Sequence, residues 1–139
     1  MRRIKIALAL ALSAASVTTQ HAWTMAPKDS QAMPMDFSNV TSRAQAEALV
    51  KRRDLVRIRF FPKRFGGRAD RENIGYVPPG ALMMIDFAND RVSGLIDLKA
   101  IDRLVVEPKY RGQSIVPVQI VYICSGEGEA TIDMTLNIW

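Results

Sequence analysis

The chain contains few of the residues that most often carry catalysis, metal binding or covalent cross-links. Its 139 residues include one cysteine and one histidine. A single cysteine excludes an internal disulfide framework and a cysteine-ligated zinc site. A single histidine excludes most catalytic triads and most histidine-ligated metal centres. We therefore expect a protein that is not an enzyme and that uses no cofactor and no metal.

The chain also lacks a hydrophobic run of the length that a membrane span needs, which is about 20 residues. Its most apolar stretch, residues 6–15 (IALALALSAA), follows the basic start Met1-Arg2-Arg3-Ile4-Lys5 and precedes small and polar residues. This order is typical of a secretory signal peptide. We place the signal peptide at residues 1–22, with cleavage between 16 and 26. We expect a periplasmic or secreted protein with no membrane span in its mature form.

The positive charge of the chain is local. The whole sequence has 19 Lys and Arg against 14 Asp and Glu, a net +5, but three of the cations belong to the signal peptide, which leaves +2. Residues 51–72 hold nine cations and three anions, a net +6, while the rest of the mature chain holds seven cations and eleven anions, a net −4. The basic character therefore points to one candidate surface, and not to a protein that is coated with positive charge.

A lead-in and a helix precede the rest of the domain. Residues 23–37 are small, polar, or Met and Pro, and we expect them to be disordered. Thr41 or Ser42 can cap a helix over residues 43–53, which is rich in alanine and ends in three cations that suit the helix dipole. Ala46, Leu49 and Val50 form its narrow apolar face.

The remaining segments predict strands, because apolar and polar residues alternate and turn residues separate them. The expected strands are residues 55–61, 73–77, 81–87, 91–98, 103–107, 115–124 and 130–139. Residues 81–87 and 91–98 would form a hairpin around Ala88-Asn89-Asp90, although residues 97–103 could form a helical turn instead. We expect one mainly β (α+β) domain over residues 38–139, with its N-terminal helix followed by an antiparallel β-sandwich or a small half-open barrel.

The basic segment is the strongest candidate binding site. Arginine side chains interleaved with Phe60, Phe61 and Phe65 suit phosphate, carboxylate or sulfated sugar groups. The candidate ligand-binding residues are Arg57, Arg59, Lys63, Arg64 and Arg68. They predict a periplasmic binding module for an acidic polymer or an acidic protein through residues 51–71, and no specific nucleic acid is expected. The alternative is a solvated strand and loop that balance the acidic remainder of the chain.

Three smaller features have structural interpretations. Cys124 ends an apolar strand and predicts a buried small hydrophobe, with an intermolecular disulfide as the alternative in an oxidising compartment. Met83 and Met84 predict core filling from a strand. Glu127-Gly128-Glu129 predicts a polar hairpin turn, since its spacing matches no calcium loop.

A particular order of segments covers about 95 residues of the chain. After the signal peptide come a capped Ala-Leu helix (41–50), a strand from Leu55, residues 80–87, a stretch with Val106, Gly112 and Ile115, a strand with Tyr122, an acidic Gly turn and a last strand (131–136). In this order the chain resembles the VirK family of small exported proteins, which are found with the virulence regulon of plant-associated bacteria. The resemblance implies a noncatalytic accessory protein of a virulence or plant-interaction system, and it transfers no catalytic residues.

Overall fold

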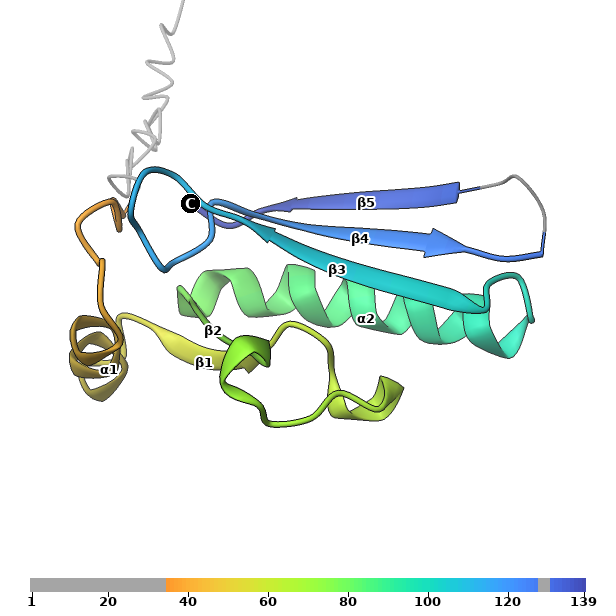
Figure 1. The fold of residues 1–139 in the computed structure, drawn as a ribbon, viewed down its shortest axis with the longest axis horizontal. Helices are drawn as coiled ribbons and strands as arrows, with labels where there is room; N and C mark the ends of the chain where they lie inside the picture. Colours follow the sequence, from red (N-terminus) through yellow and green to blue (C-terminus); the bar gives the residue numbers. More distant parts are fainter. Residues whose placement is uncertain (1–34, 128–130) are drawn as a thin grey trace, which may run out of the picture. The chain divides into compact units, whose positions relative to one another are not determined.

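The computed structural model describes residues 35–127 and 131–139. These residues belong to one compact unit, Ala32–Trp139. The expected signal peptide and most of the expected lead-in lie outside the described residues. The elements are α1 (Arg43–Lys51), β1 (Val56–Arg59), β2 (Ile74–Val77), α2 (Leu82–Asp97), β3 (Arg103–Lys109), β4 (Gln119–Ser125) and β5 (Thr131–Asn137), with short 3-10 helices at Lys63–Phe65, Arg71–Asn73 and Pro79–Ala81 (Figure 1).

Helix α1 begins and ends close to where the sequence predicts. Ser42 and Gln45 form a capping box, in which the Gln45 amide N–H donates to Ser42 Oγ at 3.3 Å and the Ser42 N–H donates to Gln45 Oε1 at 3.0 Å. The helix stops two residues before the expected end, because Arg53 adopts a left-handed backbone with φ of 67°. Its buried residue, Ala46, packs beside Leu55 and Tyr76.

Strands β1 and β2 form an antiparallel two-stranded ribbon, which confirms shortened versions of the two strands predicted there. Arg57 lies opposite Tyr76, and Arg59 lies opposite Ile74. Because successive residues of a strand point to opposite faces, these four side chains share one face of the ribbon. The other face carries Val56, Ile58 and Val77 into the larger hydrophobic core.

The hairpin predicted for residues 81–98 is wrong, because this stretch forms the single helix α2. Its buried residues are Ile85, Ala88, Asn89 and Val92, which have the i, i+3, i+4, i+7 spacing of one helix face. The sequence predicts a turn at Asn89. In the structure its side chain is 5% exposed, and its Oδ1 accepts a 3.2 Å hydrogen bond from Tyr122 Oη. A partner from a distant strand therefore stabilises a residue that favours turns inside a helix.

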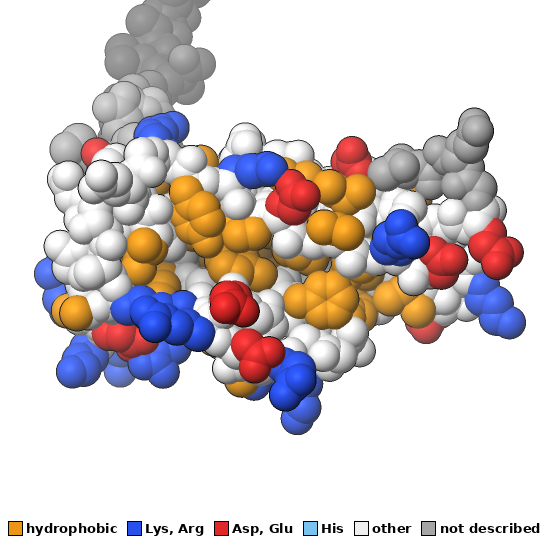
Figure 2. Space-filling view, viewed as in Figure 1, with side chains coloured by type: hydrophobic (Ala, Val, Ile, Leu, Met, Phe, Trp, Pro, Cys, Tyr) orange, Lys and Arg blue, Asp and Glu red, His pale blue; other side chains and the backbone are white. Residues whose placement is uncertain are grey.

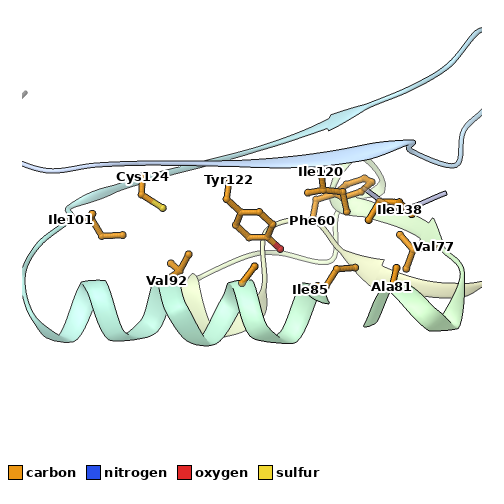
Figure 3. Close-up of a cluster of buried hydrophobic side chains, with 11 residues drawn as sticks. Phe60, Val77, Ala81, Ile85, Val92, Ile101, Ile120, Tyr122, Cys124 and Ile138 are labelled. Atoms are coloured by element: carbon orange, nitrogen blue, oxygen red, sulfur yellow. The ribbon is translucent and has the colours of Figure 1, made fainter. Parts of the chain in front are cut away.

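Strands β3, β4 and β5 form an antiparallel sheet in that order. They confirm the strands predicted near residues 103–107, 115–124 and 130–139, although β4 begins only at Gln119, after the buried Pro117. Ile120, Tyr122 and Cys124 alternate along β4 and are at most 1% exposed. Their side chains point from the sheet toward α2, where they meet Ile85 and Val92 (Figure 3).

The mixed α+β class with antiparallel sheets is confirmed for the described residues, but the sandwich or half-open barrel is not. Helix α2, and not a second sheet, packs against the inner face of the three-stranded sheet (Figures 1 and 3). The described residues contain five strands in two sheets, whereas six or seven strands were predicted. The two strands of the expected hairpin are missing because α2 takes their place.

A second, smaller core lies beside α1. It contains Phe37, Val40, Ala46, Leu55, Tyr76 and Val116. Phe37 is the last residue of the expected lead-in, yet it is buried, with its ring 5.8 Å from that of Trp139 in an edge-to-face arrangement. The buried Ser114 hydroxyl donates to the Phe37 carbonyl at 3.0 Å. The beginning and the end of the described chain are thus joined in this core.

Candidate anion-binding site

The face of the β1–β2 ribbon that bears Arg57 and Arg59 also receives two arginines from outside the ribbon. Arg43 from α1 places its guanidinium 6.0 Å from the Tyr76 ring centroid and donates a hydrogen bond to the backbone carbonyl of Arg71. Arg43, Arg71, Ile74 and Tyr76 line one groove. We call Arg43, Arg57, Arg59 and Arg71 the basic face. In Figure 2, Lys and Arg side chains gather over the end of the structure where α1 lies.

Arg57 is held by an acidic partner on α1. Its Nε donates to Glu47 Oε1 at 2.8 Å, and a second bond from Nη2 to Oε2 makes the ion pair bidentate. The Tyr76 hydroxyl also donates to Glu47 Oε1, at 2.6 Å. Hydrogen bonds from Arg57 and Tyr76 lower the pKa of Glu47, whereas burial and the bond to Glu47 raise the pKa of Tyr76. Glu47 therefore neutralises Arg57 and fixes the tyrosine ring under Arg43.

The groove beside this cluster has a volume of about 490 Å³. Tyr110, which is 47% exposed, and Ile115 form its other side. Guanidinium groups and tyrosine rings around one open groove can bind the charged groups and the faces of an anionic ligand together. Glu72 is the acidic residue in the lining, so the basic face with Glu47 and Glu72 keeps a net positive charge.

The five predicted site residues do not form one surface. Arg57 and Arg59 share the basic face, but Arg64 extends to α2, where its Nη1 lies 2.7 Å from Asp90 Oδ1 and its guanidinium lies over the Phe65 ring at 5.5 Å. Arg68 pairs with Asp70 at 3.8 Å on the loop itself. Arg59 and Lys63 make no ion pair with another described residue.

Sequence reasoning did not assign two members of the basic face. Arg71 lies in the basic segment but is not among the five predicted site residues, and the sequence places Arg43 only in the predicted helix. Arg43 and Arg71 meet across 28 positions of sequence. The alternation of β1 indicates that Arg57 and Arg59 share a face, but no local pattern indicates that α1 lies over that face.

Cys124 has the surroundings of a core side chain. Cys124 is a free cysteine with no exposed surface, which confirms the buried hydrophobe, and burial raises the pKa of its thiol. No group of three or more metal-ligating side chains gathers in the described part of the chain. None of the helices described is long and apolar enough to span a bilayer.

Comparison with known proteins gives no relative for this chain. No protein-family model matches it. No curated protein and no solved structure matches it significantly either.

Proposed function

We propose that the protein is a noncatalytic exported module that binds an anionic polymer or an acidic partner through the basic face. The observation that carries this proposal is that Arg43 and Arg71, from two separate segments, line the groove beside Tyr76, while Arg59 lies opposite the groove residue Ile74 on the same face of the ribbon. Guanidinium groups bind carboxylate, sulfate and phosphate groups through pairs of parallel hydrogen bonds. A face with several such groups favours a ligand with several anionic groups.

The shape of the site favours an extended ligand. The groove is open to solvent, and Arg57 and Arg59, which lie on the same face of the ribbon outside the groove lining, follow one another at the spacing of alternate strand residues. Tyr110 gives the groove a ring that a sugar or a side chain can cover. Lys63 lies on the following loop without an ion pair to another described residue, so it would act as a secondary contact for a long polyanion.

Retention on a heparin column tests the proposal. The triple variant Arg43→Ala, Arg59→Ala, Arg71→Ala should elute at clearly lower salt, and the slope of log affinity against log salt should fall by about two, since each lost contact removes roughly 0.7. The matched control Arg91→Ala, Lys99→Ala, Lys109→Ala removes the same charge from other exposed positions. Thermal melts must confirm that both variants fold. If both variants lose the same amount of heparin retention, only net charge matters, and a specific site is contradicted.

The variant Glu47→Gln should strengthen heparin binding, whereas the triple variant weakens it. The substitution removes the carboxylate that neutralises Arg57 while it keeps the shape of the side chain. Heparin affinity should rise, because Arg57 gains the freedom to bind the polymer. Asp54→Asn removes the anion that pairs with Arg52 at 2.8 Å and serves as the control, because Arg52 is not part of the basic face. A rise of the same size in the control would show that only overall charge matters.

The cellular role that we propose is that of an accessory protein in a virulence or plant-interaction system, as the resemblance to VirK implies. The signal-peptide pattern of residues 1–22 supports it, because such a role requires export. Fractionation of cells that express the full chain tests export, and the mature N-terminus should lie between residues 16 and 27. A transcript that rises with plant phenolic signals would support the role, and a full-length chain retained in the cytoplasm would contradict it.

A further inference from the structure

A second pocket lies between the Lys63–Phe65 turn, the C-terminal half of α2 and the start of β3. We call it the α2 pocket. Its volume is about 450 Å³, which lies within the range of small-molecule sites. We propose that the α2 pocket binds an organic cation with an apolar body, such as an aromatic amine. This ligand differs in sign from the one proposed for the basic face, and the two sites share no lining residue.

The floor of the α2 pocket is apolar and partly aromatic. Phe61 and Phe65 lie edge to face with centroids 6.4 Å apart, and Ile101 and Leu104 continue the surface. Ile101 is 6% exposed, so the floor is continuous with the main core. An apolar body of about the size of one aromatic ring would remove this surface from water.

The charges around the rim favour a cation. Asp97 and Asp102 line the pocket, and neither makes an ion pair with another described residue. Of the two arginines in the lining, Arg64 is already neutralised by Asp90. Arg103 alone opposes the two carboxylates. Helix α2 ends at Asp97, so the negative end of its dipole lies at the same rim.

Backbone contacts hold both walls of the pocket in place before a ligand arrives. On the loop side, the Asn73 side chain accepts from the Phe61 N–H at 2.7 Å and donates to the Phe61 carbonyl at 2.9 Å. On the sheet side, the Asp102 N–H donates to the Ser125 carbonyl at 3.0 Å. A Cβ on Gly126 would lie 2.4 Å from the Ala100 carbonyl oxygen, so this turn requires glycine. A pocket with fixed walls loses little entropy when it binds.

Binding of phenethylamine to the full chain tests the proposal. Methyl NMR signals of Ile101 and Leu104 should shift when the amine is titrated to about 10 mM, a range that covers weak millimolar binding, while Ile115 in the other groove serves as the internal control. Two matched probes, 2-phenylethanol and 3-phenylpropanoate, replace the cation with a neutral group and an anion. Shifts that are absent with the amine, or equally strong with 3-phenylpropanoate, would overturn the proposal.

Charge variants distinguish the rim residues from the general charge of the protein. Asp97→Asn with Asp102→Asn should lower the association constant for phenethylamine about fivefold, and Arg103→Gln should raise it about twofold, as partly exposed ion pairs allow. Asp86→Asn with Asp133→Asn removes two negative charges outside the pocket lining and should have no effect. Unchanged affinity in the double variant would overturn the proposal. Heparin retention does not depend on this outcome, so either proposed site can be contradicted without the other.

Discussion

The two helices lie against opposite faces of the β1–β2 ribbon and are held there by different kinds of contact. On the side of α1, a small apolar core with Ala46, Leu55 and Tyr76 lies beside the partly exposed ion pair between Glu47 and Arg57. On the side of α2, Ile85, Val92 and their partners from β4 form a continuous apolar core with one buried polar pair. Apolar burial supplies most of the stability, whereas exposed ion pairs contribute little. The region of α2 therefore maintains the fold, and the region of α1 carries the charge for recognition.

The largest expected effect is on the side of α2. Ile120→Ala removes a β4 side chain that is 1% exposed and packs against this helix. We expect it to lower the free energy of unfolding by about 3 kcal/mol, as large-to-small core substitutions do. Val105→Ala on β3, where the side chain is 40% exposed, is the control and should cost less than about 1 kcal/mol. Urea unfolding measures both, and equal losses would contradict a core on this side of the sheet.

Asn73→Ala should have the next largest effect. The Asn73 side chain bonds to the backbone of Phe61 in both directions and to the Arg68 carbonyl at 2.7 Å. Its loss leaves these backbone groups without partners, at a cost of about 2 kcal/mol. Hydrogen exchange at the Phe61 amide should accelerate, whereas the exposed Asn39→Ala should change neither quantity. An unchanged Phe61 amide would show that the loop holds its shape without this side chain.

Tyr122→Phe should cost about 1 kcal/mol, because Asn89 loses the donor to its buried Oδ1. The same variant changes the response to alkali. Burial raises the pKa of Tyr122 to about 12. The unfolded chain therefore releases this proton at lower pH than the folded chain does, and stability falls as the pH rises from about 10 to about 12. Thermal melts across this range should show a steeper loss for the wild type than for Tyr122→Phe; parallel losses would contradict the buried phenol.

The smallest effect is expected on the side of α1. Hydrogen bonds from Arg57 and Tyr76 lower the pKa of Glu47, so its contribution to stability is present at neutral pH and is lost as the pH falls through the folded-state pKa. Glu47→Gln should reduce the loss of stability on acidification and leave the neutral melting temperature nearly unchanged. Melting curves between neutral and acidic pH measure this difference. A large destabilisation at neutral pH would mean that α1 depends on this ion pair.

The sequence predicts elements well where local signals agree. The strict alternation from Ile132 to Ile138 marks β5, and Ser42 with Gln45 marks the start of α1. It fails at α2, because Ala88-Asn89-Asp90 has the composition of a turn, and the partner that makes Asn89 acceptable inside a helix is Tyr122, 33 positions later. The predicted β-sandwich or half-open barrel rests on six or seven strands, and this hairpin supplies two of them, so one local error changes the predicted architecture.

The candidate site shows the same limit. Alternation along β1 is enough to place Arg57 and Arg59 on one face. Their neighbours depend on packing: Arg43 meets Arg71 across 28 positions, and Arg64 reaches Asp90 across 26. These long-range pairings divide the basic segment between two sides of the molecule. The count of charges in residues 51–72 could not indicate that division.

The contact between Phe37 and Trp139 has a consequence for the order of folding. The hairpins of β3, β4 and β5 join neighbouring stretches of chain, whereas the small core beside α1 joins residues from near both ends of the described chain. Long-range contacts form late, since they close the largest loops. The small core should thus assemble last and open first. Because the basic face lies beside the small core, a bound polyanion should stabilise the folded state of this region and slow the opening of the small core.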